Sequence, residues 1–166
     1  MNSVDTIVNR ELLLDFFLTI SRFEYALKNS GFFVKHSERP DGPPPAEADW
    51  DTFALSLRTV FDPSKSGELQ DGCRYLLESP PNKQVIVNGA PAWETPTRHP
   101  ALSDFEFLIR AVRIVRNNLF HGGKFNIELH ETNERTAKLL RSTLAVLNEC
   151  LTLSPNVCRA YEQATL

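Results

Sequence analysis

A short run in the second half of the chain combines an arginine, an asparagine and a histidine, namely Arg116, Asn117 and His121. Imidazole titrates near neutral pH, so His121 is suited to moving protons during catalysis. A guanidinium can hold two phosphate oxygens at once, which suits Arg116 to stabilising negative charge on a phosphoryl group. Asn117 would hold His121 or a phosphate oxygen in register. These three residues are the candidate catalytic residues, and a phosphodiester is the matching substrate.

The spacing of the arginine and the histidine is weak by itself. With 12 arginines and 4 histidines in 166 residues, roughly 0.9 pairs at such a spacing arise by chance. The pattern gains weight from the helix that carries it. Ser103-Asp104-Phe105-Glu106 forms a capping box that predicts a helix start, and Gly122-Gly123 provides a stop.

This predicted helix has two unlike faces. At about 100° per residue, the apolar face consists of Leu108, Ala111, Val112, Val115 and Leu119. The opposite face gathers Arg110, Arg113, Asn117 and His121, with Arg116 at its edge. The simpler interpretations remain open: His121 complements the negative helix end, and Arg110 and Arg113 keep one helix face solvated.

Arg116 and His121 point in different directions on a regular helix, about 140° apart. Either the helix loosens near His121, or Arg116 reaches around it, or a second copy of the chain supplies one of the two. This geometry favours a composite site in a homodimer. Four further apolar residues lie beside the basic face and are predicted to contact a partner, the alternative being ordinary core contacts: Phe107, Ile109, Ile114 and Phe120.

The arrangement Arg116-Asn117…His121 near the end of a long helix resembles the HEPN superfamily of small helical domains, whose signature is an arginine, four to six residues and a histidine. The segment Arg22–Lys28 leading to Gly31-Phe32 is similar to the opening helix of several bacterial members. The resemblance covers about residues 5–35 and 100–153. It implies an all-α helical bundle.

The resemblance also implies a function. Many HEPN domains are metal-independent ribonucleases in which the ribose 2′-OH attacks the adjacent phosphorus, leaving 2′,3′-cyclic phosphate ends. Arg110, Arg113 and Lys124 would then draw in the RNA backbone without reading bases. A defence or toxin role, with an antitoxin or another partner protein, rests on the resemblance alone. Two alternatives stay open: a non-catalytic HEPN-like dimer that binds RNA, a nucleotide or a protein, and a purely structural helical dimer.

Composition fits one soluble domain spanning residues 1–166. The net charge of −3 and the pI near 5.8 argue against binding nucleic acid through bulk charge, so any RNA contact must be local. Such a patch exists between Phe107 and Ile127, which contains three arginines, one lysine and no acidic residue. The three cysteines show no metal or disulfide spacing, and we expect no metal, no cofactor, no membrane segment and a cytoplasmic location.

The remaining chain is predicted to be mostly helical. Ten of the eleven prolines lie between Pro40 and Pro100, which marks residues 36–101 as an irregular insertion with short elements. Helices are expected over residues 5–30, 50–61, 68–77, 131–153 and 155–163, and a small hairpin at 85–93 turns at Asn88-Gly89. The first helix should bury Leu12, Leu13, Phe16, Phe17, Ile20, Phe23 and Leu27. Its Glu24 could orient an active-site arginine if this helix packs beside the motif helix.

Overall fold

The computed structural model describes residues 3–37, 42–120 and 133–164, with the side chains of these residues except residues 3–9 and Asn133. Its helices are α1 (Ser3–Asn29), α2 (Trp50–Leu57), α3 (Gly67–Glu78), α4 (Asp104–Phe120), α5 (Asn133–Leu153) and α6 (Pro155–Gln163), with a short 3-10 helix, η1, at Pro63–Lys65. One antiparallel hairpin joins β1 (Lys83–Val87) to β2 (Ala90–Glu94). The expected all-α bundle with a small hairpin is confirmed at this level.

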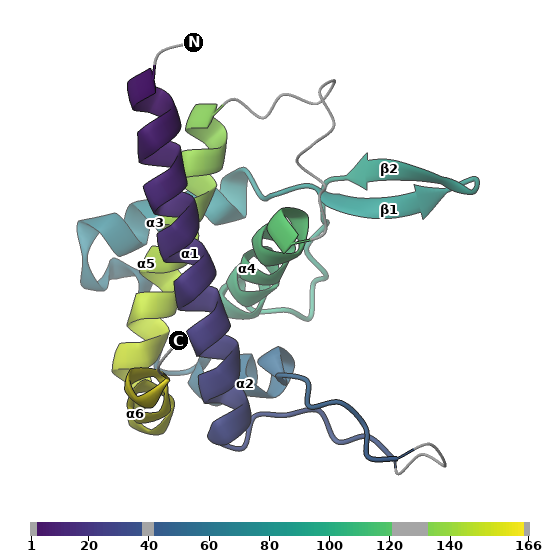
Figure 1. Ribbon diagram of the computed structural model, residues 1–166, viewed down its shortest axis with the longest axis vertical. Coiled ribbons are helices and arrows are strands. Elements are labelled where there is room, and N and C mark those ends of the chain that lie inside the picture. The colour runs from purple at the N-terminus through teal and green to yellow at the C-terminus, as the bar shows by residue number, and fades with distance from the viewer. Residues whose placement is uncertain (1–2, 38–41, 121–132, 165–166) are drawn as a thin grey trace.

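The helices form a bundle around one core (Figure 1). Helix α1 lies along α5 and α6, α5 packs on α3, and α4 lies against α2, α3 and α5. Large side chains that are almost fully buried form the centre of the core, namely Phe16, Ile20, Phe23, Leu27, Phe53, Leu76, Leu108, Ile109, Val112, Leu139, Leu140 and Leu147. Because α2 and α3 contribute to this core, much of the segment 36–101 belongs to the bundle itself.

Helix α1 ends where its sequence predicts. Gly31 adopts a φ of +89°, a left-handed conformation that costs glycine little and that commonly ends helices. The backbone N–H of Phe32 then donates to the carbonyl of Leu27 at 2.9 Å. The predicted hairpin turn is also confirmed. Asn88 and Gly89 connect the paired residues Val87 and Ala90, and their φ values of 51° and 79° are the positive angles that such a tight turn requires.

Helix α2 is shorter than expected. It ends at Leu57, whose carbonyl accepts from the N–H groups of both Val60 and Phe61 at 3.0 Å. The turn brings the ring of Phe61 onto Phe105, with ring centroids 4.3 Å apart. The apolar periodicity suggested a helix up to Phe61 because Phe61 also packs inward, although it does so from the turn that follows α2.

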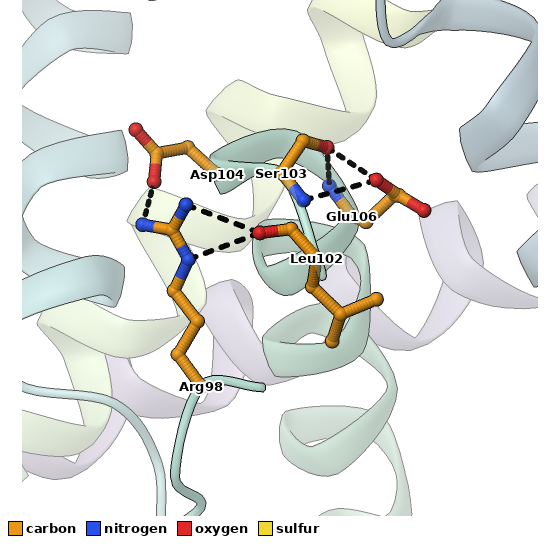
Figure 2. Close-up of polar contacts among 5 residues, drawn as sticks. All are labelled: Arg98, Leu102, Ser103, Asp104 and Glu106. Atoms are coloured by element: carbon orange, nitrogen blue, oxygen red, sulfur yellow. Dashed lines mark hydrogen bonds and ion pairs between the residues drawn. The ribbon is translucent and has the colours of Figure 1, made fainter. Parts of the chain in front are cut away.

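The start of α4 is fixed by the predicted capping box (Figure 2). The N–H of Glu106 donates to Ser103 Oγ at 3.2 Å, and the N–H of Ser103 donates to Glu106 Oε2 at 3.0 Å. On the other side of the chain, Arg98 forms an ion pair with Asp104 and donates through Nε and Nη2 to the carbonyl of Leu102 at 3.2 and 3.1 Å. These contacts fix the position and direction in which the motif helix begins.

We expect the substitution Ser103→Ala to lower the free energy of unfolding by about 1 kcal/mol. The Ser103 hydroxyl and then its N–H hold the pKa of Glu106 below its ordinary value of 4.5. The ionised carboxylate therefore stabilises the fold above that value, and this contribution is lost as the pH falls through the lowered pKa. In Ser103→Ala, urea unfolding should show a weaker loss of stability in this acid range.

The matched control is Ser66→Ala. Ser66 caps α3 by accepting from the N–H of Leu69 at 3.2 Å, and the third residue after it is Leu69 rather than an acid. Ser66→Ala should cost a similar amount of stability and leave the acid dependence at the wild-type level. Equal acid dependence in both variants would contradict the role given to Glu106.

Candidate functional site

The core face of α4 agrees with the sequence. Leu108, Ala111, Val112 and Val115 are buried, and Leu119 is partly buried against the core. The prediction that four apolar neighbours contact a partner is wrong for three of them. Phe107, Ile109 and Ile114 are buried within the chain, because α4 is covered by other helices on more sides than its own periodicity indicates. Phe120 is 40% exposed.

Arg116 lies near the end of α4 and is held by three neighbours. Its Nη2 donates to Glu24 Oε2 of α1 at 3.2 Å, and its Nη1 donates to Asn117 Oδ1 at 3.0 Å. Its guanidinium carbon lies 4.8 Å from the centre of the Phe120 ring. The Arg116 side chain is thus oriented by an ion pair, an amide and an aromatic ring.

The Arg116 guanidinium has N–H donors that make no hydrogen bond to Glu24 or Asn117. Arg116 has five N–H donors, of which two make the bonds above, and its side chain is 27% exposed. Its Nε is buried without a hydrogen-bond partner in the described part of the chain, which is unusual for a buried donor. The donors left for an incoming anion are the second N–H groups of Nη1 and Nη2, because Nε is buried, and Glu24 and Asn117 keep the side chain in place.

Glu24 of α1 contacts the Arg116 guanidinium and can therefore position it. The sequence suggested this role only on condition that α1 packs beside the motif helix, and the ion pair shows that the two side chains meet. A second contact between the helices stacks Phe17 of α1 on Phe120, with ring centroids 5.1 Å apart. The prediction of Phe17 as a core residue is wrong, because its side chain is 49% exposed.

The two arginines of the basic face are placed differently. Arg113 pairs with Asp51 of α2 at 2.9 Å, and both side chains are largely exposed at 42% and 85%. Arg110 is half-buried and has no ion-pair partner among the described residues. Asp51 was not anticipated from sequence, and no local signal could have identified it, since it lies 62 residues from Arg113.

The structure brings together only part of the predicted site. Arg116 and Asn117 are in contact, and Asn117 is exposed. His121 and Lys124, together with the helix stop at Gly122-Gly123, lie outside the described residues. Asn118, which the sequence did not single out, is 9% exposed and donates to the carbonyl of Asn82 at 2.8 Å. This bond ties the base of the hairpin to the motif end of α4.

Metal clusters, membrane spans and reactive thiols are three other features that bear on function in the described parts of the chain. In residues 3–37, 42–120 and 133–164 no group of three or more metal-ligating side chains comes together. Over the same residues no helix is long and apolar enough to cross a bilayer. The three cysteines are free; burial raises the pKa of Cys73 to about 11 and also raises that of Cys150. Both thiols therefore stay protonated and are poor nucleophiles at neutral pH.

Comparisons with protein-family models, with curated proteins and with solved structures found no match to this chain.

Proposed function

We propose that this protein is a HEPN-like endoribonuclease that cleaves RNA without a metal ion. The observation that supports it best is the setting of Arg116. An arginine held by Glu24, Asn117 and Phe120, with unused donors and a partly exposed side chain, is a preorganised anion clamp. His121, the proposed proton carrier, follows it by five residues.

In the proposed reaction His121 removes the proton from a ribose 2′-OH, and the 2′ oxygen attacks the adjacent phosphorus. The bond from phosphorus to the 5′ oxygen breaks, and that oxygen receives a proton from the imidazolium of His121. The products are a 2′,3′-cyclic phosphate and a 5′-OH end. Arg116 stabilises the negative charge that builds on the phosphoryl oxygens as the new bond forms.

The RNA backbone would approach along the basic face of α4. The exposed pair between Arg113 and Asp51 contributes little stability in water, so Arg113 can exchange its carboxylate for a phosphate. Arg110 already has no ion-pair partner among the described residues. With Lys124, these residues would hold the backbone without reading bases.

The test is cleavage of a generic single-stranded RNA in EDTA, followed by analysis of the product ends. We expect cleavage that leaves cyclic phosphate ends. We also expect that a second copy of the chain completes the site. Loss of all cleavage in EDTA, with recovery on adding a divalent ion, would contradict the mechanism. Toxicity on expression in a bacterium would support a toxin-like role with a restraining partner.

A second function, that of a non-catalytic HEPN-like dimer that binds RNA, a nucleotide or a protein, is favoured by a separate observation. Both Arg113 and Arg116 have carboxylate partners within the chain, an arrangement that is also expected if these arginines hold helices together and take no part in catalysis. If the wild type binds RNA in a salt-dependent way and cleaves none under any condition, this second function is the correct one.

We expect Glu24→Gln to separate RNA binding from cleavage. Removing the carboxylate leaves Arg116 less firmly oriented, so kcat should fall several-fold. The loss of a negative charge beside the site should leave KM unchanged or lower it. Single-turnover cleavage and filter binding of the same RNA measure the two effects. A parallel rise in KM with constant kcat would show that Glu24 does not position Arg116.

A further inference from the structure

The hairpin of β1 and β2 projects from the bundle beside the motif end of α4 (Figure 1). Its base is held by several contacts. The carbonyl of Asn82 accepts from Asn118 Nδ2 of α4 at 2.8 Å, and the side-chain oxygen of Asn82 accepts from Thr95 Oγ1 at 2.8 Å. Lys83 and Glu94, which lie directly opposite each other, form an ion pair at 2.9 Å. The hairpin therefore has a defined position relative to α4.

Beyond this base the hairpin is uncharged and largely apolar. The ten residues from Gln84 to Trp93 contain no acidic or basic side chain. Because side chains alternate along a strand, the pairing of Gln84 with Trp93 and of Ile86 with Pro91 places these four side chains on one face. Ile86 is 70% exposed and Trp93 is partly exposed. The hairpin thus presents an apolar face without charge.

The two tryptophans of the chain have different surroundings. Trp50 is 5% exposed and stacks on Phe23, with ring centroids 5.3 Å apart. Trp93 lies outside the hydrophobic core, and among the described residues it stacks on no aromatic ring. A partly exposed indole ring without an aromatic partner can stack on a nucleobase, an interaction that needs no charge and accepts any base.

The hairpin also borders the surface proposed to hold the RNA phosphates. Successive residues of a helix point about 100° apart. Arg116 contacts α1, Asn117 is exposed, and Asn118 contacts the base of the hairpin. Arg110 and Arg113 point within about 40° of Asn117. The exposed basic face of α4 therefore lies between α1 and the hairpin.

We propose that Trp93 stacks on an unpaired nucleobase of the RNA whose phosphates lie on the basic face of α4, and that Ile86 extends the same platform. The cations of α4 favour an anionic polymer, and the bases are the uncharged aromatic groups that RNA carries. Trp93 pairs with Gln84, two residues beyond Asn82, which places it about 7 Å along the strand from the contact with α4.

This inference rests on the proposed function and names its substrate class as single-stranded RNA. A base in a duplex has both faces covered by its neighbours, whereas an unpaired base offers a face to an aromatic side chain. The basic face would hold the charge of the backbone, and the uncharged hairpin would receive the base.

Binding of RNA that cannot be cleaved tests this role. A 2′-O-methylated single strand lacks the attacking hydroxyl, so its binding can be measured without cleavage. Trp93→Ala should bind this strand about tenfold more weakly than the wild type. The dependence of binding on salt should stay the same, because no cation is lost. An abasic strand of equal length keeps the phosphates and should bind Trp93→Ala and the wild type equally.

Further variants separate stacking from apolar packing. Trp93→Phe keeps an aromatic ring and should retain most of the affinity, whereas Trp93→Leu should bind as weakly as Trp93→Ala. The single strand should also quench the fluorescence of the wild type and not that of Trp93→Phe, in which only the buried Trp50 emits. Val87→Ala is the matched control. Val87 is 50% exposed on the opposite face of the hairpin, and its loss should leave binding unchanged.

Wild-type affinity in Trp93→Ala, an equal loss of affinity for the abasic strand, or a wild type that binds neither strand would overturn the inference. Circular dichroism and urea unfolding check that the variants are folded. Cleavage of unmodified RNA in EDTA decides the proposed function separately. A protein that cleaves RNA, and whose Trp93→Ala variant binds the single strand normally, would keep the proposed function and exclude the role of Trp93.

Discussion

His121→Ala is expected to reduce the rate of RNA cleavage by about 10²–10⁴, the usual contribution of a general acid or base. No other side chain of the proposed mechanism titrates near neutral pH, so nothing replaces the lost imidazole. Binding of the same RNA should stay close to the wild-type level, because a neutral imidazole carries no charge toward phosphate. Single-turnover cleavage in EDTA and equilibrium binding are the two measurements.

His99→Ala is the control for this substitution. His99 is exposed and accepts a hydrogen bond from the N–H of Ala101 at 3.2 Å, in the loop before α4. Its removal should leave cleavage unchanged. If His121→Ala cleaves as fast as the wild type, the ribonuclease mechanism is wrong whatever the state of the dimer.

Arg116→Ala is expected to reduce cleavage by about 10²–10³, as for the loss of a preorganised donor to the transition state. Arg116→Lys should restore little of this activity. A lysine ammonium is a point charge that cannot bond Glu24, Asn117 and a phosphate in the fixed planar arrangement of a guanidinium. The loss should appear mainly in kcat, since the interaction strengthens as charge develops on the phosphoryl group.

Arg113→Ala gives the comparison. Arg113 is more exposed and is paired with Asp51 at the surface, so its loss should weaken RNA binding and lower the salt dependence of binding, with kcat nearly unchanged. A large loss of kcat in Arg113→Ala and none in Arg116→Ala would show that the clamp has been assigned to the wrong arginine. Urea unfolding of Arg116→Ala checks that the loss does not come from instability.

The ends of the elements could be predicted where local chemistry sets them. The start of α4 follows from Ser103 and Glu106, the end of α1 from Gly31, and α6 from Ser154-Pro155, although the Ser154 side chain makes no cap hydrogen bond. Each depends on residues within about one helical turn. The length of α2 was overestimated, because the inward packing of Phe61 depends on Phe105 of α4.

The candidate site could be predicted only in its residue types. The sequence identified Arg116, Asn117 and His121, and it suggested Glu24 under a condition on packing. It did not reveal that Phe17 would be exposed and would stack on Phe120. Adjacent Phe16 and Phe17 both suit a core helix by periodicity, and only the positions of α4, α5 and α6 around α1 distinguish them.

The sequence alone determined that this is a helical chain with an arginine and an asparagine in the last turn of one amphipathic helix, and it predicted that His121 joins them. It also showed a stretch from Phe107 to Ile127 that contains no acid. The tertiary structure decided the charge of that surface, because Glu24 and Asp51 come from 92 and 62 residues away to pair with Arg116 and Arg113. Helix periodicity depends on near neighbours, whereas ion pairs and exposure depend on which helices pack together.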